Sequence, residues 1–328
     1  MLAYTLKRIV FMIPTLIAIS IVTFIIIQLP PGDFVTSLAA QMSQQGDTID
    51  ASTLALLRKQ YGLDEPIWVQ YWIWISKIAF AGDFGRSFDW DMPVSDLLWA
   101  RLGLTFVLSF TALIFTWLIA FPVGIYSAVR KYSAGDYLAT FLAFIGLAVP
   151  NFLFALVLMY IALKFWGVSI DGLYSSRFVD APWSWEKFLD LAQHLVIPVI
   201  VLSSSGIAAL VRIMRANLLD ELFKPYVTTA RAKGLPEWRL ILKYPVRAAL
   251  NPFVSTIGWT LPELVSGATV TAIVLNLPTT GPLLLRALIG QDVYLAGSMI
   301  LMLSVLTVIG TLISDLLLAW LDPRIRYQ

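Results

Sequence analysis

The sequence predicts an all-α polytopic membrane protein with about six transmembrane helices. Hydrophobic residues make up 59% of the 328 positions and charged residues 13%, which is roughly half the charged share of an ordinary soluble chain. The apolar residues come in long uninterrupted blocks rather than in the short periodic runs of a water-soluble core. Such a chain cannot cover itself with polar surface, so lipid is its expected solvent.

The first apolar block runs from Ile9 to Leu29, about 20 residues that would rise about 30 Å as a helix and cross the hydrocarbon layer. It follows Lys7 and Arg8, but it is longer than the apolar core of a secretory signal and no convincing small-residue cleavage site comes after it. We therefore expect a retained first span. The later blocks are Leu104 to Val123, Leu138 to Leu163, Leu195 to Leu210, Phe253 to Leu275, and Leu295 to Leu318.

Two of these blocks contain features that affect helix packing. Pro150 and Asn151 interrupt the hydrogen-bond ladder of the third block, which predicts a structural kink there, with a bent pore helix as the alternative. In the fourth block, Ser203 to Gly206 offer small groups that let another helix approach closely. We favour this packing role over a polar channel lining.

The placement of Lys and Arg predicts the orientation, because positive residues beside a span are retained in the cytoplasm. Six spans put both termini on one side. The segment from Pro30 to Arg101 is acid-rich and is predicted to face outward. Both termini are then cytoplasmic, together with the basic residues Lys7, Arg8, Arg130, Lys131, Arg212, Arg215, Lys224, Arg231, Lys233, Arg239, Lys243, Arg247, Arg324 and Arg326.

This topology divides the chain into three regions. Residues 1–30 are the cytoplasmic N-terminal end and the first span, and residues 31–101 are an extracytoplasmic loop region with amphipathic helices. Residues 102–328 hold the remaining spans, including a cytoplasmic loop at 217–250. The outer region is too small and too often interrupted by turn signals to be a catalytic domain.

An aromatic helix face is predicted in the outer region. After a helix start at Glu65-Pro66, the residues Trp68, Tyr71, Trp72 and Ile75 recur at three- and four-residue spacing. Aromatic side chains at that spacing suit the membrane interface. We favour an interfacial or packing helix over a surface that stacks substrate.

Composition excludes several classes of function. The net charge of +2 and the lack of a Lys/Arg-rich run argue against a nucleic-acid partner. With no cysteine, disulfides, thiolate catalysis and cysteine-ligated metal are excluded. The one histidine, His194, cannot build a metal site alone. It lies one helical step after Asp190, which predicts helical packing or capping rather than metal or proton chemistry.

The most informative stretch lies between the fourth and fifth blocks, from Asn217 to Pro252, and is polar and basic. Pro225 to Lys233 is predicted to form a helix that Gly234 ends. Pro236 to Tyr244 is predicted to form a second helix with proline in its first turn. The sequence thus predicts a helix-turn-helix that faces the cytosol.

Small residues are expected on the surface of the first helix, namely Thr229, Ala230 and Ala232. A short rigid element with such a surface can seat closely in a groove of another protein and move as a lever. A membrane channel needs such a lever only if something external drives it.

At this point the sequence resembles the permease subunits of ABC importers for peptides, with nickel and some oligosaccharide systems as relatives. The family's cytoplasmic loop carries Glu-Ala-Ala, three residues and Gly. Here Thr228, Thr229, Ala230 and Gly234 occupy those positions, with Thr228 in place of the glutamate. Further matches in order and spacing are Pro14-Thr15, Pro31-Gly32-Asp33, Gly62-Leu63-Asp64, Gly82-Asp83, Gly85-Arg86-Ser87, Pro122-Val123-Gly124, His194-Leu195, Pro198, Arg212, Arg215 and Asp322-Pro323-Arg324-Ile325-Arg326.

The resemblance implies the type I ABC importer transmembrane fold with a cytoplasmic coupling helix. The implied partners are a second, homologous permease subunit, two ABC ATPase subunits, an extracytoplasmic solute-binding protein and membrane lipid, in a bacterial plasma membrane. The implied substrate is a peptide, or a related oligosaccharide or metal chelate. By resemblance, the ATPase-docking loop consists of Tyr226, Thr228, Thr229, Ala230, Arg231, Ala232, Lys233, Gly234 and Leu235.

This chain is not expected to be an enzyme. No glycine-rich loop ending in Gly-Lys-Ser/Thr occurs in it, so it cannot bind and hydrolyse ATP by that route. The energy must come from another subunit. ATP and Mg²⁺ are accordingly expected in the partner ATPase subunits, and no cofactor in this chain.

Charged residues near the spans are candidates for the translocation pathway. Glu263 is predicted near mid-membrane, where a buried charge costs at least about 2.5 kcal/mol unless water or a partner is close. The alternative is a protonated or hydrogen-bonded packing residue. Asp315 is expected to pair with a cytoplasmic-side arginine rather than to meet substrate. Arg212 and Arg215, three residues apart on one helical face, are expected either to close a gate by pairing with acids or to anchor their span.

Two other classes of function remain as alternatives. An ion-gradient-driven secondary transporter would use Glu263 and Asp315 as proton or sodium sites. A membrane enzyme would need a metal-ligand cluster or a nucleophile-base pair, and neither is visible in the loops. Only an ATP-driven importer gives the basic loop an ATPase partner.

Overall fold

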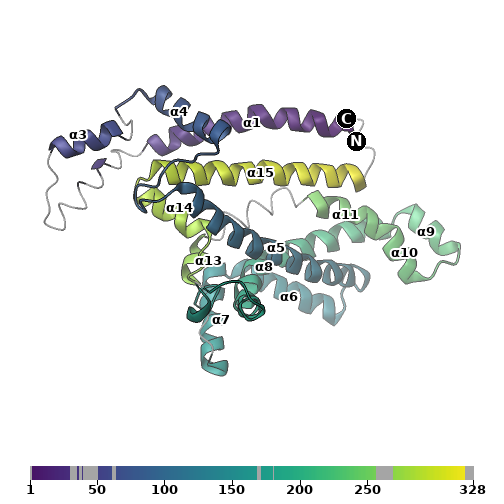
Figure 1. Cartoon of the computed structure of the whole chain (residues 1–328). Helices are drawn as coiled ribbons and strands as arrows, with labels where there is room; N and C mark the ends of the chain where they lie inside the picture. The colour runs from purple at the N-terminus through teal and green to yellow at the C-terminus, as the bar shows by residue number, and fades with distance from the viewer. Residues whose placement is uncertain are drawn as a thin grey trace.

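The computed structural model describes residues 2–29, 35, 36, 39, 51–60, 64–167, 171–179, 181–255 and 269–321. This part of the chain is helical, apart from turns, loops and one isolated β-bridge between Arg86 and Pro93 (Figure 1). The helices are α1 (Leu2–Gln28), α3 (Ala51–Gln60), α4 (Ile67–Ser76), a π-helical turn (Lys77–Ala81), α5 (Val94–Val129), α6 (Ala134–Ala148), α7 (Asn151–Trp166), a 3-10 turn (Ser176–Phe178), α8 (Trp185–Leu222), α9 (Pro225–Ala232), α10 (Glu237–Lys243), α11 (Pro245–Ser255), α13 (Thr269–Val274), α14 (Thr280–Ile289) and α15 (Val293–Leu321).

Four of the described helices are long and apolar enough to cross a membrane, or five if the bent pair α6 and α7 counts as one span. The first, second, fourth and sixth predicted blocks lie in α1, α5, α8 and α15, and the third is divided between α6 and α7. The fifth block begins in α11 and ends just after α13, and its middle, residues 256–268, lies outside the described residues. The predicted all-α membrane fold is confirmed.

Close packing of α5 on α8 forms the centre of the molecule (Figure 1). A Cβ atom placed on Gly124 of α5 would lie only 2.7 Å from the Met214 Cβ of α8, so the two backbones approach as closely as glycine permits. Ser203 donates a hydrogen bond of 3.0 Å to the Ala112 carbonyl. Such contacts matter because lipid tails are as apolar as leucine and give helices no hydrophobic reason to associate. The packing role predicted for Ser203 to Gly206 is confirmed at Ser203.

The third span is sharply bent, as its proline predicts. The chain bends by 107° between α6 and α7. Val149 is extended, with φ −89° and ψ 122°, because a proline disfavours helical backbone in the residue before it. α6 packs on α8, where a Cβ on Gly146 would lie 2.9 Å from the Ser204 carbonyl oxygen. The kink at Pro150 is therefore fixed by local chemistry and by close contact with a neighbouring helix.

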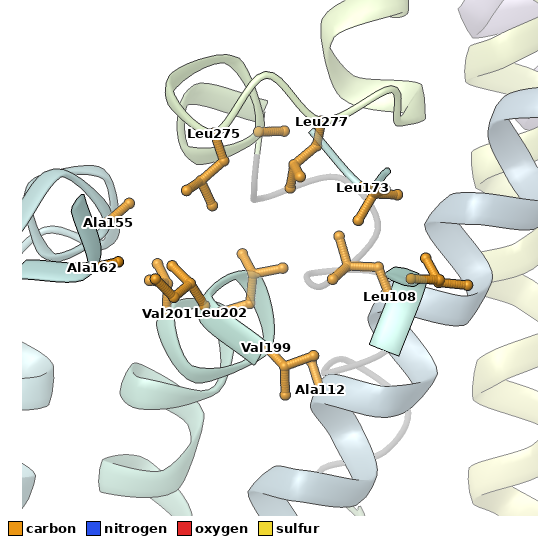
Figure 2. Close-up of a cluster of buried hydrophobic side chains, with 13 residues drawn as sticks. Leu108, Ala112, Ala155, Ala162, Leu173, Val199, Val201, Leu202, Leu275 and Leu277 are labelled. Carbon is orange, nitrogen blue, oxygen red and sulfur yellow. The ribbon is translucent and has the colours of Figure 1, made fainter. Parts of the chain in front are cut away.

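A hydrophobic core joins α5, α7 and α8 to the turn that follows α13. Figure 2 shows side chains from these elements converging, and they include Leu108, Ala112, Ala155, Ala162, Leu173, Val199, Val201, Leu202, Leu275 and Leu277. The loop before α8 is also tied to this turn, because the Gly172 N–H donates to the Leu275 carbonyl at 3.1 Å. The turn after α13 is thus held against the centre of the bundle.

α1 and α15 lie side by side (Figure 1). Arg8 of α1 and Asp315 of α15 form an ion pair with 3.1 Å between Nη1 and Oδ2, and the Asp315 side chain is 20% exposed. The arginine partner predicted for Asp315 is confirmed. The start of α1 and the end of α15 lie at the same end of the molecule as α9 and α10, while α14 lies toward the other end (Figure 1).

The aromatic face of α4 is divided between packing and exposure. The Tyr71 hydroxyl lies 2.9 Å from the Ser20 hydroxyl of α1. Trp68 and Trp72 are 74% and 66% exposed, respectively. Trp74, which the predicted face did not include, is the most buried aromatic of this helix and packs against α1. The predicted packing of α4 is confirmed, and its two exposed tryptophans point away from the bundle.

A buried carboxylate fixes the loop before α5 to the start of α15. Asp292 Oδ2 accepts hydrogen bonds from the Ser87 hydroxyl at 2.5 Å and from the backbone N–H groups of Phe88 at 2.8 Å and Asp89 at 3.2 Å. Its other oxygen accepts from the Leu295 N–H at 3.0 Å and so caps the first turn of α15. Asp292 is fully buried, so water could not accept these hydrogen bonds if the carboxylate were removed.

Asp292→Ala is expected to lower the midpoint of heat-induced unfolding of the purified protein, because several buried donors lose their acceptor. The expected loss is about 3 kcal/mol, since each orphaned buried group costs about 1–3 kcal/mol. Asp91→Asn is the matched control, because Asp91 lies in the same loop, its side chain is 85% exposed, and asparagine tolerates its left-handed φ of +47°. Equal effects of the two substitutions would contradict an anchoring role for Asp292.

Candidate functional site

Two short helices joined by a tight turn, α9 and α10, project between α8 and α11, and residues 225–243 are called the hairpin below. α9 starts at Pro225, whose fixed φ suits the first helical position, and ends at Ala232. Gly234 follows with φ of +77°, a left-handed conformation that glycine adopts without strain. Pro236 directly precedes α10. The predicted helix-turn-helix is confirmed, with α9 ending one residue before the predicted Lys233.

One face of the hairpin is buried in a hydrophobic cluster that it shares with α5, α8 and α11. Val227 and Ala230 of α9 and Leu240 and Ile241 of α10 are each 7% exposed or less. Because protein interiors are densely packed, a displacement of the hairpin is transmitted to the helices that contact it. The side chains that share this cluster on α5, α8 and α11 are Ala120, Ala128, Leu210, Val211, Met214, Leu218, Val246 and Ala249.

The opposite face of α9 is exposed and carries short side chains. Thr228, Thr229 and Ala232 are exposed and lie on the side of the helix away from Val227. Ala230 was expected on this surface, and that prediction is wrong, because residues three apart share a helix face and Ala230 therefore faces the core with Val227. The remaining predicted positions are exposed at Tyr226, Arg231, Lys233 and Gly234 and partly buried at Leu235.

Polar contacts hold the hairpin at its turn and at its start. Arg231 Nη2 and Glu237 Oε1 lie 2.5 Å apart, which links α9 to α10, and this pair raises the pKa of Arg231 and lowers that of Glu237. Glu221 accepts from Lys224 Nζ at 2.5 Å and from the Tyr226 hydroxyl. Burial and the bond to Glu221 raise the pKa of Tyr226, so its hydroxyl remains a neutral donor. The exposed pairs set the geometry of the hairpin more than its stability.

A bidentate ion pair joins α8 to α6 near the hairpin end. Arg215 donates to Asp136 through Nε at 2.9 Å and Nη2 at 2.8 Å, and the Tyr132 N–H donates to the same carboxylate at 2.9 Å. The side chains are 27% and 3% exposed, respectively. Sequence reasoning identified Arg215 but missed Asp136. The available signal was an acidic residue at the start of an otherwise apolar block, directly after a basic turn.

The structure does not gather the other charged candidates into one site. Arg212 lies on α8 near Arg215, but it is exposed. Asp315 is held by Arg8 on the other pair of helices. Glu263 lies outside the described residues. Arg215 and Asp315 therefore tie helices together at separate places.

His194 has the packing role that its spacing predicts. Its Nδ1 lies 2.8 Å from the carbonyl oxygen of Asp190, one helical turn earlier. The Asp190 carboxylate in turn accepts from the Ser175 N–H at 2.8 Å. In the part of the chain that the structure describes, no group of three or more His, Asp or Glu residues is placed to hold a metal ion.

The N-terminal third of the chain and the remainder match two models of binding-protein-dependent transport membrane components. Residues 120–327 match the binding-protein-dependent transport system inner membrane component, and residues 1–109 match the N-terminal region of such a membrane component. The chain belongs to this family. This membership agrees with the resemblance given by the motifs, and it makes the chain a membrane permease component rather than an ATPase.

Curated relatives match over the whole chain. The oligopeptide transport system permease protein AppB of Bacillus subtilis (strain 168) is 36% identical, with 100% of both chains covered. The dipeptide transport system permease protein DppB of Escherichia coli (strain K12) is 31% identical, and the glutathione transport system permease protein GsiC of Salmonella typhimurium is 33% identical, again with 100% of each chain covered. Each relative is thus a permease protein of a transport system.

A solved ABC transporter shares the membrane fold of this permease component. A chain of the inward-facing MetNI methionine ABC transporter is similar with a TM-score of 0.51 at 16% identity, which covers 69% of this chain and 96% of that chain. At this identity the likeness concerns the fold alone, and it confirms the type I ABC importer transmembrane fold. Neither the family nor the relatives support the ion-gradient-driven alternative.

Arg215→Gln is expected to destabilise the purified protein, because it leaves the buried Asp136 carboxylate without a charged partner. We expect a loss of about 2 kcal/mol, below the full cost of orphaning a buried charge because water reaches Arg215. Arg212→Gln is the control and should change stability by less than about 0.5 kcal/mol. Heat-induced unfolding in detergent provides the measurement, and similar small shifts for both variants would refute the structural role of the pair.

Proposed function

We propose that this protein forms half of the translocation pathway of an ATP-driven, solute-binding-protein-dependent importer of peptides. The observation that carries this proposal is the hairpin, one face of which is buried in a cluster shared with α5, α8 and α11 while the other is exposed and bears short side chains. The full-length matches to oligopeptide, dipeptide and glutathione permease proteins support a peptide as the substrate.

The hairpin and both chain termini face the cytoplasm in this proposal, and the protein is a multi-pass component of a bacterial plasma membrane. The basic residues of the hairpin, and Lys7 and Arg8 near the start of α1, support this orientation through the positive-inside rule. The start of α1 and the hairpin helices α9 and α10 also lie toward one end of the molecule (Figure 1). In this orientation residues 31–101 form an extracytoplasmic region and residues 102–328 form the membrane-spanning core, the division that the sequence predicts.

The exposed face of α9 docks on one of two ABC ATPase subunits, which bind ATP and Mg²⁺. Short side chains at Thr228, Thr229 and Ala232 allow the helix to lie close in a groove. Ala230 acts from the other side by holding the helix on its own core. A second, homologous permease subunit completes the pathway, and an extracytoplasmic solute-binding protein delivers the substrate.

α8 connects the hairpin to the far side of the membrane. It runs for 38 residues, about 57 Å at 1.5 Å per residue, against a hydrocarbon layer of about 30 Å. Because the hairpin packs on α11 and shares a buried cluster with the inner ends of α5 and α8, movement of the docked ATPases shifts these helices together. This rocking changes access to the pathway from one side of the membrane to the other.

The charged candidates have different roles in this mechanism. Glu263 is proposed to line the pathway, because a mid-membrane acid is tolerated beside water. The contacts of Arg215 and Asp315 favour a role in holding helices rather than in meeting substrate. Arg212, which is exposed, anchors its helix at the cytoplasmic side.

Ala232→Trp is expected to prevent docking without unfolding the protein, because Ala232 is exposed and a large ring there blocks close approach. The amount of ATPase subunit that co-purifies with the variant should be about tenfold lower than with the wild type, or lower still. The reason is that a few close contacts commonly carry about two or more kcal/mol of the binding energy of an interface. Peptide uptake into proteoliposomes, driven by ATP on the hairpin side, should fall in parallel.

Lys131→Trp is the matched control, because Lys131 is an exposed residue in the turn between α5 and α6, outside the hairpin. It should keep both the ATPase subunits and uptake. Unchanged ATPase retention by Ala232→Trp would argue against hairpin docking. Wild-type uptake that ignores ATP and collapses with an ionophore would argue against the importer itself.

A further inference from the structure

A pocket lies at the end of α5 that is remote from the hairpin. Its cavity volume is about 280 Å³, it is half open, and it is lined by the start of α5, the turn after α13, the beginning of α14 and the loop before α5. The lining side chains that matter for its chemistry are Trp90, Arg101, Pro278, Thr279, Pro282 and Arg286. Figure 1 places α14 away from α9 and α10, so the pocket and the hairpin belong to different ends of the molecule.

The pocket is built from restrained elements. Pro278 and Pro282 fix their backbone φ angles, and Thr279 is 5% exposed. Leu277 and Leu283, on either side of Thr279, belong to buried hydrophobic clusters. The Thr280 N–H donates to the Thr105 hydroxyl at 3.0 Å, which ties α14 to α5. The walls are therefore formed before any ligand arrives.

The two arginines of the pocket differ in their partners. Arg286 is neutralised by Asp89, with 2.9 Å between Nε and Oδ2, and its guanidinium lies 4.5 Å from the centre of the Trp90 ring. Arg101 is partly buried and makes no ion pair or hydrogen bond through its side chain with any residue that the structure describes. The pocket thus holds one positive charge without a counter-ion in the described part of the chain, at Arg101. The neighbouring pair of Arg286 and Asp89 shows that an arginine of this pocket can bind a carboxylate.

The chemistry of Arg101 favours an acceptor ligand. Arginine presents its donors in a planar fork that matches a carboxylate, and a partly desolvated guanidinium binds such a group more strongly than one in water. A carboxylate would satisfy Arg101, whereas a cation would be repelled by it.

We propose that this pocket receives an aspartate or glutamate side chain from the extracytoplasmic solute-binding protein, an inference that rests on the proposed function and orientation. The pocket is half open, so a side chain that projects from a docked protein can enter it. The position at the end opposite the hairpin places the pocket on the outer side. Arg101 is the residue that binds the incoming carboxylate, and Trp90 and Arg286 form the wall against which it rests.

The test measures binding of the solute-binding protein that activates the wild-type complex, with the whole complex held in lipid nanodiscs. Arg101→Gln should raise the Kd of the loaded binding protein about thirtyfold, at the lower end of the range measured when one partner of a desolvated charge pair is removed. It should also weaken the dependence of Kd on salt, because one attractive pair is lost. Arg101→Lys should restore part of the affinity, and Arg286→Gln should have a smaller effect because Asp89 already occupies that guanidinium.

Arg177→Gln is the matched control, since Arg177 is an exposed arginine in the loop before α8 and does not line the pocket. It should leave the Kd within about twofold of wild type, as rim charges usually do. Heat-induced unfolding of each complex checks that the variants remain folded. If Arg101→Gln does not fold, Arg101→Lys replaces it in the test. Its Kd should still exceed that of the wild type, because lysine cannot make the bidentate contact.

The outcomes separate this inference from the proposed function. Wild-type complex that binds no solute-binding protein would overturn the proposed function and this inference with it. Wild-type binding with an unchanged Kd for Arg101→Gln, or an equal loss for Arg177→Gln, would overturn the pocket alone. An unchanged Kd combined with a raised KM for peptide at saturating binding protein would assign the pocket to the transported peptide instead.

Discussion

The close packing of α5 on α8 is the constraint on which the rest of the molecule depends. Lipid offers no hydrophobic gain for bringing helices together, so contact must come from short side chains and interhelical hydrogen bonds. Gly124 against Met214 and Ser203 against Ala112 meet that requirement. The hairpin rests on one end of this pair, while α7, α14 and the turn after α13 rest on the remainder. A change at either end therefore reaches the other through the same two helices.

Much of the fold and part of the candidate site could be predicted from the sequence, because each relevant signal is local. Apolar blocks of membrane-spanning length indicate the spans, and Pro150 breaks the third one through its missing N–H and its effect on Val149. The hairpin boundaries follow from Pro225, Gly234 and Pro236, which act on their own backbone. Such features need no knowledge of which helix packs on which.

The partners of charged residues could not be predicted in the same way, because they depend on contacts between distant segments. Arg215 is recognisable, but its pairing with Asp136 requires α6 to lie against α8. Asp292 gathers donors from a loop about 200 residues earlier in the chain. Ala230 was placed on the wrong face because short side chains alone do not reveal which side of a helix contacts a core. The pocket beside Arg101 depends on the joint placement of α5, α14 and the loop before α5.

The length of α8 also bears on how the protein tolerates different bilayers. Cell membranes differ in hydrocarbon thickness by several Å, and a helix that only just spans the layer must tilt or stretch the lipid to compensate. α8 extends beyond the layer in water at one or both ends, and its rigid backbone fixes the distance from the loop before it to the hairpin. A thinner or thicker bilayer can therefore surround a different stretch of α8 without changing the distance that this helix sets between its two ends.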